Sequence, residues 1–513
     1  QHDAREVIPP FSPLRREQVA IVGSGPSGLS AAYHLARKGI GSTLFEAGDR
    51  PGGMLRMGIP EHRLPRDVLD QEIEVITNLG AEIVTNSALG RDFSVRDLFD
   101  QGYKAVYLAL GAHRGMDLGL RGEDASGVIQ GVEFLRRTNT GSTEVGSRVA
   151  VIGGGNVAID AARSALRLGA QKVQIIYRRT RQEMPALPEE IEAAATEGIE
   201  MTFLAAPLEI LTDNGAVAGL KCQRMQLGEP DESGRRRPEP IPDSEFSIDV
   251  DQIIPAIGQQ PDATGLEDVP GLELGRRGTV NADPTTFATG AEGVFAGGDL
   301  QTGPWIAIGA VAAGKEAAES IRRYLDGEDL AADRPVRELP EIPEHRPIPS
   351  DVETCPRCSM PELSIEERTC GFSEVEVGFD PETGAVEAAR CLNCGYCCEC
   401  YQCVDACLAQ AVDHSQVPET KELDVGSVIL CPGANTFDPS RLDQFYYYTN
   451  HPNVVTSLEF ERILSATGPS AGHLQTRSDG REPTRIAWLQ CVGSRDQNQC
   501  GNAYCSAVCC MYA

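Results

Sequence analysis

The first residues with a chemical signature are three glycines in the pattern G-x-G-x-x-G: Gly23, Gly25 and Gly28. The first glycine permits a tight turn, the second lets the backbone approach a pyrophosphate, and the third lets a helix pack on a strand. The pyrophosphate then lies at the N-terminus of that helix. Glu46 follows at the end of the next expected strand, where a carboxylate can accept ribose hydroxyls. We predict a dinucleotide site here; the alternative is a tight turn without a ligand.

A second motif of the same kind follows later in the chain. Its residues are Gly153, Gly155, Asn156 and Ala158. The strand after it ends in Arg178 and Arg179, at the place where the first motif has its acid. Arginines there suit a 2′-phosphate, so this site is expected to prefer NADPH, with NADH possible. Arg181 is a further candidate, and the alternative is a solvated basic turn.

Two nucleotide sites in one module indicate a division of labour: the first holds FAD, and the second admits the nicotinamide that reduces it. Gly298 and Asp299 in the segment GGDL precede an expected helix, where Asp299 can bind the ribityl chain of the flavin. The alternative role for Asp299 is a helix N-cap. Residues 1–350 contain no Cys-x-x-Cys pair, which argues against a dithiol mechanism in this part.

Cysteines dominate the C-terminal part, because only Cys222 of the 17 precedes residue 350. We interpret Cys222 as a buried structural thiol. The candidate metal ligands are Cys355, Cys358, Cys370, Cys391, Cys394, Cys397, Cys400, Cys403 and Cys407, followed by Cys491, Cys505, Cys509 and Cys510. Residues 397–407 have the bacterial ferredoxin spacing C-x2-C-x2-C-x3-C, although Leu408 replaces the usual proline. We predict two or three 4Fe–4S clusters; a zinc ribbon is the alternative.

The elements that must position these residues indicate an α/β fold with two Rossmann-like, three-layer domains. Helices are expected near 66–79 and 188–197, and a strand in 251–261 leads back to the first domain. The predicted domains are 15–141 plus 251–327 for FAD, 142–250 for NAD(P)H, a Pro-rich linker at 328–350, a ferredoxin-like iron–sulfur domain at 351–412, and a partial second flavoprotein-like α/β segment at 413–513. The last segment is expected to contain the strand and glycine turn GSVILCPGA.

Composition excludes some classes of function. The net charge of −29 repels phosphate backbones and anionic membranes, which argues against a nucleic-acid partner. No run approaches the roughly 18 to 20 apolar residues of a membrane span, so only peripheral membrane association stays open. Clustered cysteines favour metal ligation in a reducing compartment over a secreted disulfide scaffold, so we expect a cytoplasmic protein. The sequence begins at Gln1 and ends within a cysteine motif, so we expect a fragment at one or both ends.

Residues 15–327 resemble the small subunit of glutamate synthase and its relatives among bifurcating transhydrogenases. The matching stretches are VAIVGSGPSGLSAAYHLARKG, PGGMLRMGIPEHRLP, VIGGGNVAIDAAR, YRRTRQEMPA, IGQQP and VFAGGDL. The resemblance implies FAD at the first motif and NADPH at the second. The residues it implies for FAD are Gly52, Gly53, Met54 and Leu55 near the isoalloxazine, together with Gly111 and Asp299. The family's N-terminal iron–sulfur domain is not at the start of this chain, but RCLNCG and FSEVEVGF look like its elements.

Residues 424–513 resemble part of the A subunit of heterodisulfide reductase. The matching stretches are DVGSVILCPGANTFDPS, HPNVVTSLEFERILSATGP, SDGREPTRIAWLQCVGSRD and YCSAVCCMYA. In that family the cysteines that match Cys491, Cys505, Cys509 and Cys510 hold a 4Fe–4S cluster. The resemblance leaves a second flavin open, because that family's own FAD fingerprint is not visible here.

Together these features predict an enzyme that moves electrons from NADPH through FAD to 4Fe–4S clusters. The expected partners are subunits of a redox complex, either heterodisulfide-reductase-like, ferredoxin or hydrogenase-type modules. The cofactors carry the chemistry, so no side chain is assigned as a general acid or base. One alternative is the electron-input subunit of a glutamate-synthase-type amidotransferase. The other is a non-catalytic scaffold that binds zinc and a flavin.

Overall fold

The computed structural model describes most of the chain. The described residues include 18–332 (apart from 142, 231–235 and 276), 334 and 355–390. Beyond these they are 403–404, 407–409, 411–413, 416, 420–431, 436–442, 446–495, 497, 501 and 503–505. Residues Gln1–His414 form one compact unit, and Ser415–Ala513 form a second.

The first unit contains a parallel five-stranded sheet whose strands are far apart in the sequence. In spatial order they are β14 (Val294–Ala296), β4 (Ala105–Leu108), β1 (Gln18–Val22), β2 (Gly41–Phe45) and β3 (Glu82–Val84). The sequences QVAIV of β1 and AVYL of β4 are buried except for the first residue of β1. Such continuous apolar runs are typical of parallel strands that are covered on both faces. This sheet and its helices are called the first part below.

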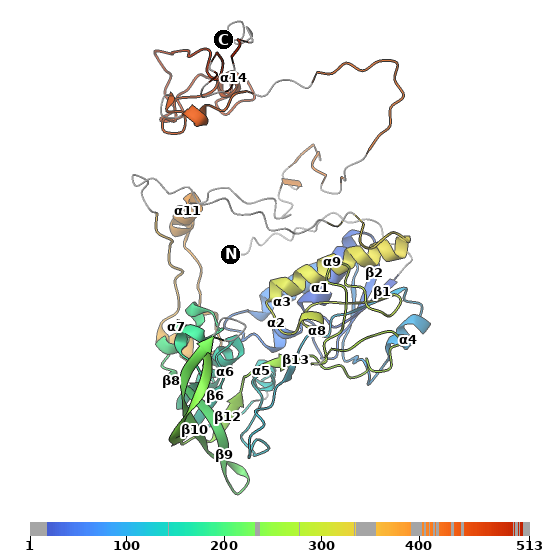
Figure 1. Cartoon of the computed structure of the whole chain (residues 1–513), viewed down its shortest axis with the longest axis vertical. Helices are drawn as coiled ribbons and strands as arrows, with labels where there is room; N and C mark the ends of the chain where they lie inside the picture. The colour runs from blue at the N-terminus through green and yellow to red at the C-terminus, as the bar shows by residue number, and fades with distance from the viewer. Residues whose placement is uncertain are drawn as a thin grey trace. The chain divides into compact units, whose positions relative to one another are not determined.

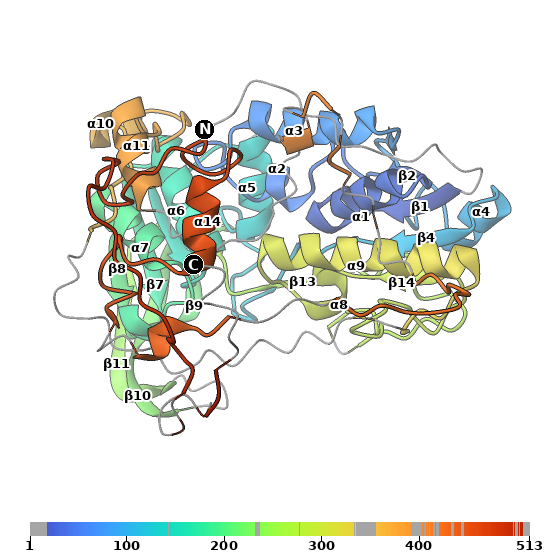
Figure 2. The same cartoon turned by 90° about the horizontal axis from the view of Figure 1, so that it is seen from above.

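Long helices cover one face of the first sheet, whereas the short helices at 95–100 and 299–302 and the long segment 266–291 cover the other. On one face, α1 (Pro26–Arg37) and α9 (Ala307–Asp326) lie side by side in both views (Figures 1 and 2). Small residues let them approach: a Cβ on Gly314 of α9 would lie 2.2 Å from the carbonyl oxygen of Ser27. The remaining helices of this part are α2 (Met54–Met57), α3 (Arg66–Asn78), α4 (Val95–Asp100) and α8 (Asp299–Thr302). The helix expected near 66–79 is therefore confirmed as α3.

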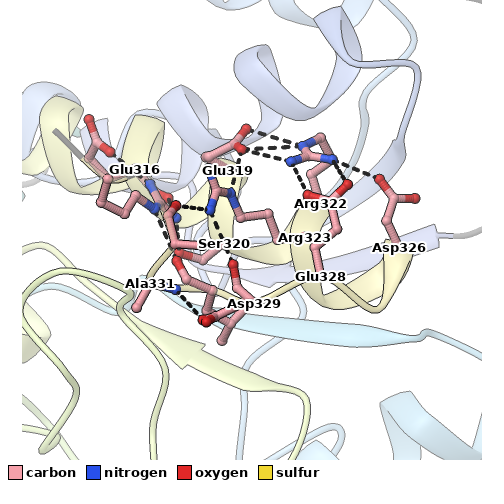
Figure 3. A network of polar contacts seen from close by, with 12 residues as sticks. Glu316, Glu319, Ser320, Arg322, Arg323, Asp326, Glu328, Asp329 and Ala331 are labelled. Carbon is pink, nitrogen blue, oxygen red and sulfur yellow. Dashed lines mark hydrogen bonds and ion pairs between the residues drawn. The ribbon is translucent and has the colours of Figure 1, made fainter. Parts of the chain in front are cut away.

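The C-terminal half of α9 carries ion pairs that hold the chain as it leaves the helix (Figure 3). Glu319 accepts a hydrogen bond from Arg322 at 2.9 Å and lies 2.8 Å from the Nζ of Lys38, at the end of α1. Arg334, beyond the helix, lies 2.9 Å from a carboxylate oxygen of Glu316. Burial alone would raise the pKa of Glu319, but hydrogen bonds from Arg322, Arg323 and Lys38 outweigh it and lower the pKa. The direction in which the chain leaves α9 is thus fixed by charge.

A second parallel sheet forms the second part of this unit. Its strands, in spatial order, are β12 (Gln252–Pro255), β6 (Arg148–Ile152), β7 (Lys172–Tyr177) and β8 (Glu200–Phe203). Its helices are α5 (Gly131–Asn139), α6 (Asn156–Arg167), the 3-10 helix η1 (Arg181–Glu183) and α7 (Pro188–Thr196). The helix expected at 188–197 is confirmed as α7. The strand expected to lead back to the first domain differs: β12 pairs in parallel with β6, because its buried apolar residues complete the edge of the second sheet.

An antiparallel sheet extends the second part. It consists of β9 (Ala205–Asp213), β10 (Ala216–Pro230) and β11 (Arg236–Ile248). Cys222 lies in β10 and is fully buried, and burial raises its pKa to about 12, as a structural thiol requires. Between the two parallel sheets, β5 (Arg114–Gly115) pairs antiparallel with β13 (Gln259–Gln260). The two chain crossings between the sheets are therefore hydrogen-bonded to each other.

The segment 355–390 carries two short helices, α10 (Ile365–Thr369) and α11 (Pro381–Ala389). Ser364 and Glu367 form a capping box at the start of α10, and Asp380 caps α11. Val375 is buried, and its amide donates to the carbonyl oxygen of His62 at 3.2 Å. Part of the cysteine-rich segment therefore packs against a loop of the first part.

The described residues of the second unit contain the 3-10 helix η2 (Pro439–Leu442) and α14 (Ser457–Leu464). Thr456 and Glu459 form a capping box that starts α14. The expected strand in GSVILCPGA is not found: residues 426–431 have no regular structure, and residues 432–434 lie outside the described part. Ile429 and Leu430 are more than 80% exposed. An apolar strand needs a neighbour to pair with, and the described residues of this unit include no strand.

Candidate functional site

The first glycine motif forms a turn that only glycine can make. Gly23 follows β1 with φ +104°, and a Cβ there would lie 2.4 Å from the carbonyl oxygen of Ala109. A Cβ on Gly28 would lie 2.0 Å from the carbonyl oxygen of Gly23, so helix and turn are in direct contact. Gly25 is the N-cap of α1, and no side chain caps the helix there. The free amides of this helix end are ready to bind an anion.

A second glycine pair closes over the same turn. The amide of Gly52 donates to the carbonyl oxygen of Ser24 at 3.1 Å. Gly53 has φ +51°, and a Cβ on it would lie 2.6 Å from the Cα of Gly25. Met54 and Leu55 begin α2 directly after this contact. Four residues that the resemblance assigned to the flavin therefore lie beside the first motif.

Glu46 is a buried carboxylate at the end of β2, only 6% exposed. Its Oε2 accepts hydrogen bonds from the amide (3.2 Å) and the hydroxyl of Ser24. Its Oε1 accepts from the amide of Gly48 at 2.8 Å. These donors fix the carboxylate next to the glycine turn, where Oε1 keeps a lone pair for a ribose hydroxyl.

Gly298 and Asp299 complete this side of the first part. Gly298 has φ +64° and is the N-cap of α8; a Cβ on it would lie 3.0 Å from the Cβ of Ser27 in α1. Asp299 is the first helical residue, so the N-cap alternative is wrong for it; its carboxylate accepts from the amide of Trp305 at 3.2 Å. Burial raises the pKa of Asp299 to about 6. Gly111, after β4, has φ +73°, and an added Cβ would meet nothing within 4 Å.

The second motif repeats the same geometry on the second sheet. Gly153 has φ +150°, and a Cβ there would lie 2.3 Å from the carbonyl oxygen of Ala256. Gly155 is the N-cap of α6 without a side-chain cap, and an added Cβ would meet only Pro185 at 3.9 Å. Asn156 accepts from the amide of Leu187 at 3.1 Å, so its side chain orients the loop before α7. Ala158 is fully buried.

The basic residues after β7 face different ways. Arg178 is exposed, and no ion pair or hydrogen bond involves its side chain within the described part of the chain. Arg179 is buried, and its Nε donates to the carbonyl oxygen of Arg236 at 2.8 Å. Arg181 pairs with Glu192 at 2.5 Å. Of these three arginines, Arg178 is the one that is exposed without an ion pair to any described residue, and the shared spacing of Arg178 and Arg179 did not predict this difference.

A chain of buried charges joins the two parts, and sequence reasoning missed it. On α6, Asp160, Arg163 and Arg167 lie at helical spacing on one face. Glu197 accepts from both Arg163 and Arg167 at 2.7–3.1 Å, and its side chain is fully buried. Arg63, from a loop of the first part, pairs with Asp160 at 2.8 Å. Three charged residues on one helical face were a signal of this contact.

His62, next to Arg63, lies where the cysteine-rich segment packs. It is 1% exposed, and neither ring nitrogen has a hydrogen-bond partner among the described residues. Burial, together with the positive charges of Arg167, Arg163 and Arg63, lowers its pKa to about 2, so the ring is neutral. The ring of Phe372 lies 6.0 Å away. Residues 60–63 are therefore a junction of three regions.

The described cysteines do not form a complete metal site. Within the described ranges, no three potential ligands of the His, Cys, Asp or Glu type lie close enough to hold a metal ion. The amide of Cys358 donates to Glu387, and Arg390 donates to the carbonyl oxygen of Cys355. The described candidates are Cys355, Cys358, Cys370, Cys403, Cys407, Cys491 and Cys505, whereas Cys391, Cys394, Cys397, Cys400, Cys509 and Cys510 lie outside the described residues. The iron–sulfur ligands stay a prediction.

No helix in the described ranges has the length and apolar character to cross a membrane.

The comparisons with known proteins cover mainly residues that form the two glycine-motif sites. The family model described as pyridine nucleotide-disulphide oxidoreductase matches residues 17–314. The β subunit of an NADP(+)-dependent formate dehydrogenase from Moorella thermoacetica is 46% identical over 74% of this chain and 54% of its own length. A putative NADPH glutamate synthase small chain from Cereibacter sphaeroides is 38% identical over 61% of this chain and 78% of its own.

Among solved structures, FprA from Mycobacterium tuberculosis (a His57Gln mutant) has a TM-score of 0.53 at 20% identity. It covers 61% of this chain and 85% of its own. This likeness supports the α/β dinucleotide-binding fold and no more. The chain spans about half the length of the Moorella relative. The resemblance to glutamate synthase small subunits is confirmed, and the chain belongs to the pyridine nucleotide-disulphide oxidoreductase family.

Proposed function

We propose that this oxidoreductase takes electrons from NADPH, passes them through FAD to iron–sulfur clusters in its C-terminal part, and delivers them to a partner subunit. One observation carries the proposal. Two helices, α1 and α6, have N-termini without a side-chain cap behind glycine turns, with a buried acid (Glu46) beside the first turn and an exposed arginine (Arg178) after the strand that follows the second. This pairing suits an unmodified ribose at the first site and a 2′-phosphate at the second.

The residues of the first part fit FAD. The free amides of α1 and the side-chain-free surface of Gly25 and Gly53 suit a pyrophosphate, and Glu46 suits a ribose. Asp299, with its half-buried carboxylate beside α1, suits the ribityl chain. When bound, FAD supplies a ring system that accepts a hydride and gives up electrons one at a time. The protein's task is to hold and orient that ring and to shield it from water.

The residues of the second part fit NADPH, and Arg178 is the proposed ligand of its 2′-phosphate. An exposed guanidinium without a partner in the described part of the chain can bind a phosphate without first breaking an ion pair. Arg179 is not assigned this role, because its Nε already donates to the carbonyl oxygen of Arg236. The selectivity for NADPH over NADH is therefore expected to depend on one arginine.

The acceptor side of the proposal rests on the cysteine pattern and on the relatives. The Moorella match covers 74% of this chain, a larger share than residues 1–350 make up, so it extends into the cysteine-rich part. That relative is named as a subunit, which supports a partner for this chain as well. Within this class, we propose a heterodisulfide-reductase-like complex, because residues 424–513 resemble its A subunit. Ferredoxin or hydrogenase-type modules are the other candidate partners, because they also accept single electrons.

An anaerobic titration tests the electron donor. NADPH is expected to bleach the flavin absorbance of the full chain at a lower concentration than NADH. Arg178→Ala is expected to lower kcat/KM for NADPH by about tenfold to a hundredfold, since a hydrogen bond to a charged group contributes about 1.5–3 kcal/mol. Its kcat/KM for NADH is expected to stay within about twofold. The control is Arg121→Ala, which removes an exposed arginine of another ion pair. Equal losses of kcat/KM with both nucleotides in Arg178→Ala would overturn the role of Arg178.

Metal analysis tests the acceptor side separately. Anaerobically purified full chain is expected to contain iron and acid-labile sulfide, and NADPH is expected to produce an EPR signal of reduced clusters. Zinc without iron would instead support the non-catalytic scaffold.

Electron input to a glutamate-synthase-type amidotransferase is the second candidate, because the Cereibacter relative is named as such a small chain. Formation of glutamate from glutamine and 2-oxoglutarate after reconstitution with a large subunit would favour it. Without that activity, the first proposal stands on the metal analysis.

A further inference from the structure

One side chain of the first part, Arg63, forms ion pairs with two helices of the second part. Its Nη1 lies 2.8 and 2.9 Å from the two carboxylate oxygens of Asp160 on α6. Its Nε lies 3.0 Å from Oε1 of Glu190, in the first turn of α7. The side chain of Asp160 is only 7% exposed, so water screens this contact little. Arg63 therefore links the two parts through a shielded salt bridge.

The buried arginines of α6 pair with carboxylates of the second part itself, whereas Asp160 on the same helix does not pair with either of them. Arg163 pairs with Glu190 and Glu197, and Arg167 pairs with Glu197. Within the described residues, the one ion-pair partner of Asp160 is Arg63, from the other part. A buried carboxylate without a paired cation is strongly unfavourable. The second part is thus built to meet Arg63 at this position.

Asp160 also lies in the helix that carries the second nucleotide site. It follows Asn156, the first residue of α6, by four residues, so the two lie one turn apart on the same side of the helix. The uncapped amides proposed to bind the NADPH pyrophosphate are at that end of α6. Arg63 consequently forms its ion pair with α6 within one turn of the proposed nucleotide site. It does not belong to either glycine motif.

Other contacts show that the loop around Arg63 is itself held in place. Asn139, at the end of α5, donates to the carbonyl oxygens of Met57 (2.8 Å) and Ile59 (3.2 Å). Arg66 donates to the carbonyl oxygen of Ile59 at 2.8 Å. These contacts hold the loop that presents Arg63 between α3 of the first part and α5 of the second.

We propose that Arg63 is a positioning residue for hydride transfer: its pairs with Asp160 and Glu190 hold α6 and α7 in the orientation that brings the nicotinamide to the flavin. The inference rests on the proposed function, because hydride transfer between two separately bound dinucleotides depends on the relative orientation of the two parts. Reacting atoms must approach to about 3–3.5 Å, and a displacement of about 1 Å can lower the rate about a hundredfold. Arg63 acts through α6 and touches neither reactant.

The charged groups that face Asp160 decide at which pH it is protonated, and so at which pH its ion pair with Arg63 is lost. They are Arg63 from the first part, Arg163 on α6 and Glu190 on α7. Burial raises the pKa of Asp160 to about 6, and Arg63 opposes this only in part. Protonation near that pH removes the charge that Arg63 binds. The effect of losing Arg63 is therefore expected to shrink as the pH falls through 6.

Anaerobic stopped-flow measurement of flavin reduction by NADPH tests the proposal on the full chain with bound FAD. Arg63→Ala and Asp160→Asn are each expected to lower the limiting rate constant at pH 7.5 about tenfold or more. The FAD content and the Kd for NADPH are expected to stay within about twofold. Arg63→Lys, which keeps the charge opposite Asp160, is expected to recover part of the rate. The double variant Arg63→Ala/Asp160→Asn is expected to be no slower than either single variant.

Two results would overturn the proposal. One is an unchanged limiting rate in both single variants, and the other is a loss that appears in the Kd for NADPH to the same extent as in the rate. Asp160→Asn is nearly isosteric, so it remains informative if Arg63→Ala does not fold. Arg121→Ala, which removes an exposed pair with Glu209, is the matched control. If wild-type protein with bound FAD is not reduced by NADPH at all, the proposed function fails rather than the role of Arg63.

Discussion

The helices α1 and α6 begin in the same way in their two parts but are held in different ways. Both start behind a glycine turn, both lack a side-chain cap, and both follow the central strand of a parallel sheet. α1 packs on α9 through small residues such as Ser27 and Gly314, and its described side chains include no buried charge. α6 instead buries Asp160, Arg163 and Arg167 against α7 and the loop of Arg63.

This difference indicates what each helix is required to do. Phosphate binding needs only backbone amides, so the glycine turn can be repeated unchanged on both sheets. Close packing of small residues holds α1 rigidly against its own part, as suits a cofactor that stays bound. Buried ion pairs add little net stability, but they are specific for one arrangement of the charged groups. They suit a helix whose orientation relative to another part matters.

The largest effect, on folding stability, is expected from a variant that breaks the buried ion pairs of α6. Glu197→Gln leaves the fully buried Arg167 without a counter-charge, and breaking such a buried pair costs about 3–5 kcal/mol. Denaturant titration of the full chain measures the loss. Glu192→Gln is the control: its partly exposed pair with Arg181 contributes at most about 1 kcal/mol. Similar stabilities of the two variants would show that the buried charges do not hold α6.

The next effect concerns the third position of each glycine motif. Gly28→Ala places a Cβ 2.0 Å from the carbonyl oxygen of Gly23. We expect the variant to lose about 3 kcal/mol of folding stability and to lose its bound FAD. The matched change in the second motif is Ala158→Gly, which costs about 1 kcal/mol of helix stability. Thermal unfolding and the FAD-to-protein absorbance ratio measure both. Retention of FAD by Gly28→Ala would mean that α1 can move away from the turn.

The smallest effect is a difference in acid sensitivity. Burial would raise the pKa of Glu197, but hydrogen bonds from Arg167 and Arg163 outweigh it and lower the pKa below its ordinary value of 4.5. A carboxyl with a lowered folded-state pKa stabilises the fold above its unfolded-state pKa, and this stabilisation is lost as the pH falls. The Tm of the wild type is therefore expected to decline below about pH 4.5. The decline of Tm with falling pH is expected to be shallower in Glu197→Gln than in the wild type. Equal slopes in the two proteins would mean that other carboxyl groups cause the decline.

Several features of the fold and site were predictable because they depend on local sequence. The glycine turns, α3, α7 and the buried Glu46 follow from spacing and apolar periodicity, which act over a few residues. The sheet to which β12 belongs was not predictable, because two parallel sheets offer similar edges to an apolar strand. The expected strand and turn at residues 426–434 has an apolar run, but no strand among the described residues of the second unit could pair with it.

The sequence by itself determined that two glycine turns follow parallel strands and that an acid follows one and arginines the other. Residue type and spacing suffice for this, because the turn needs glycine wherever it occurs. Only the tertiary structure decided that Arg179 donates to the β11 backbone, that Arg178 is exposed with no ion pair among the described residues, and that Arg63 meets Asp160. Those contacts join residues that are distant in the chain, and their partners are fixed by how the sheets and helices pack.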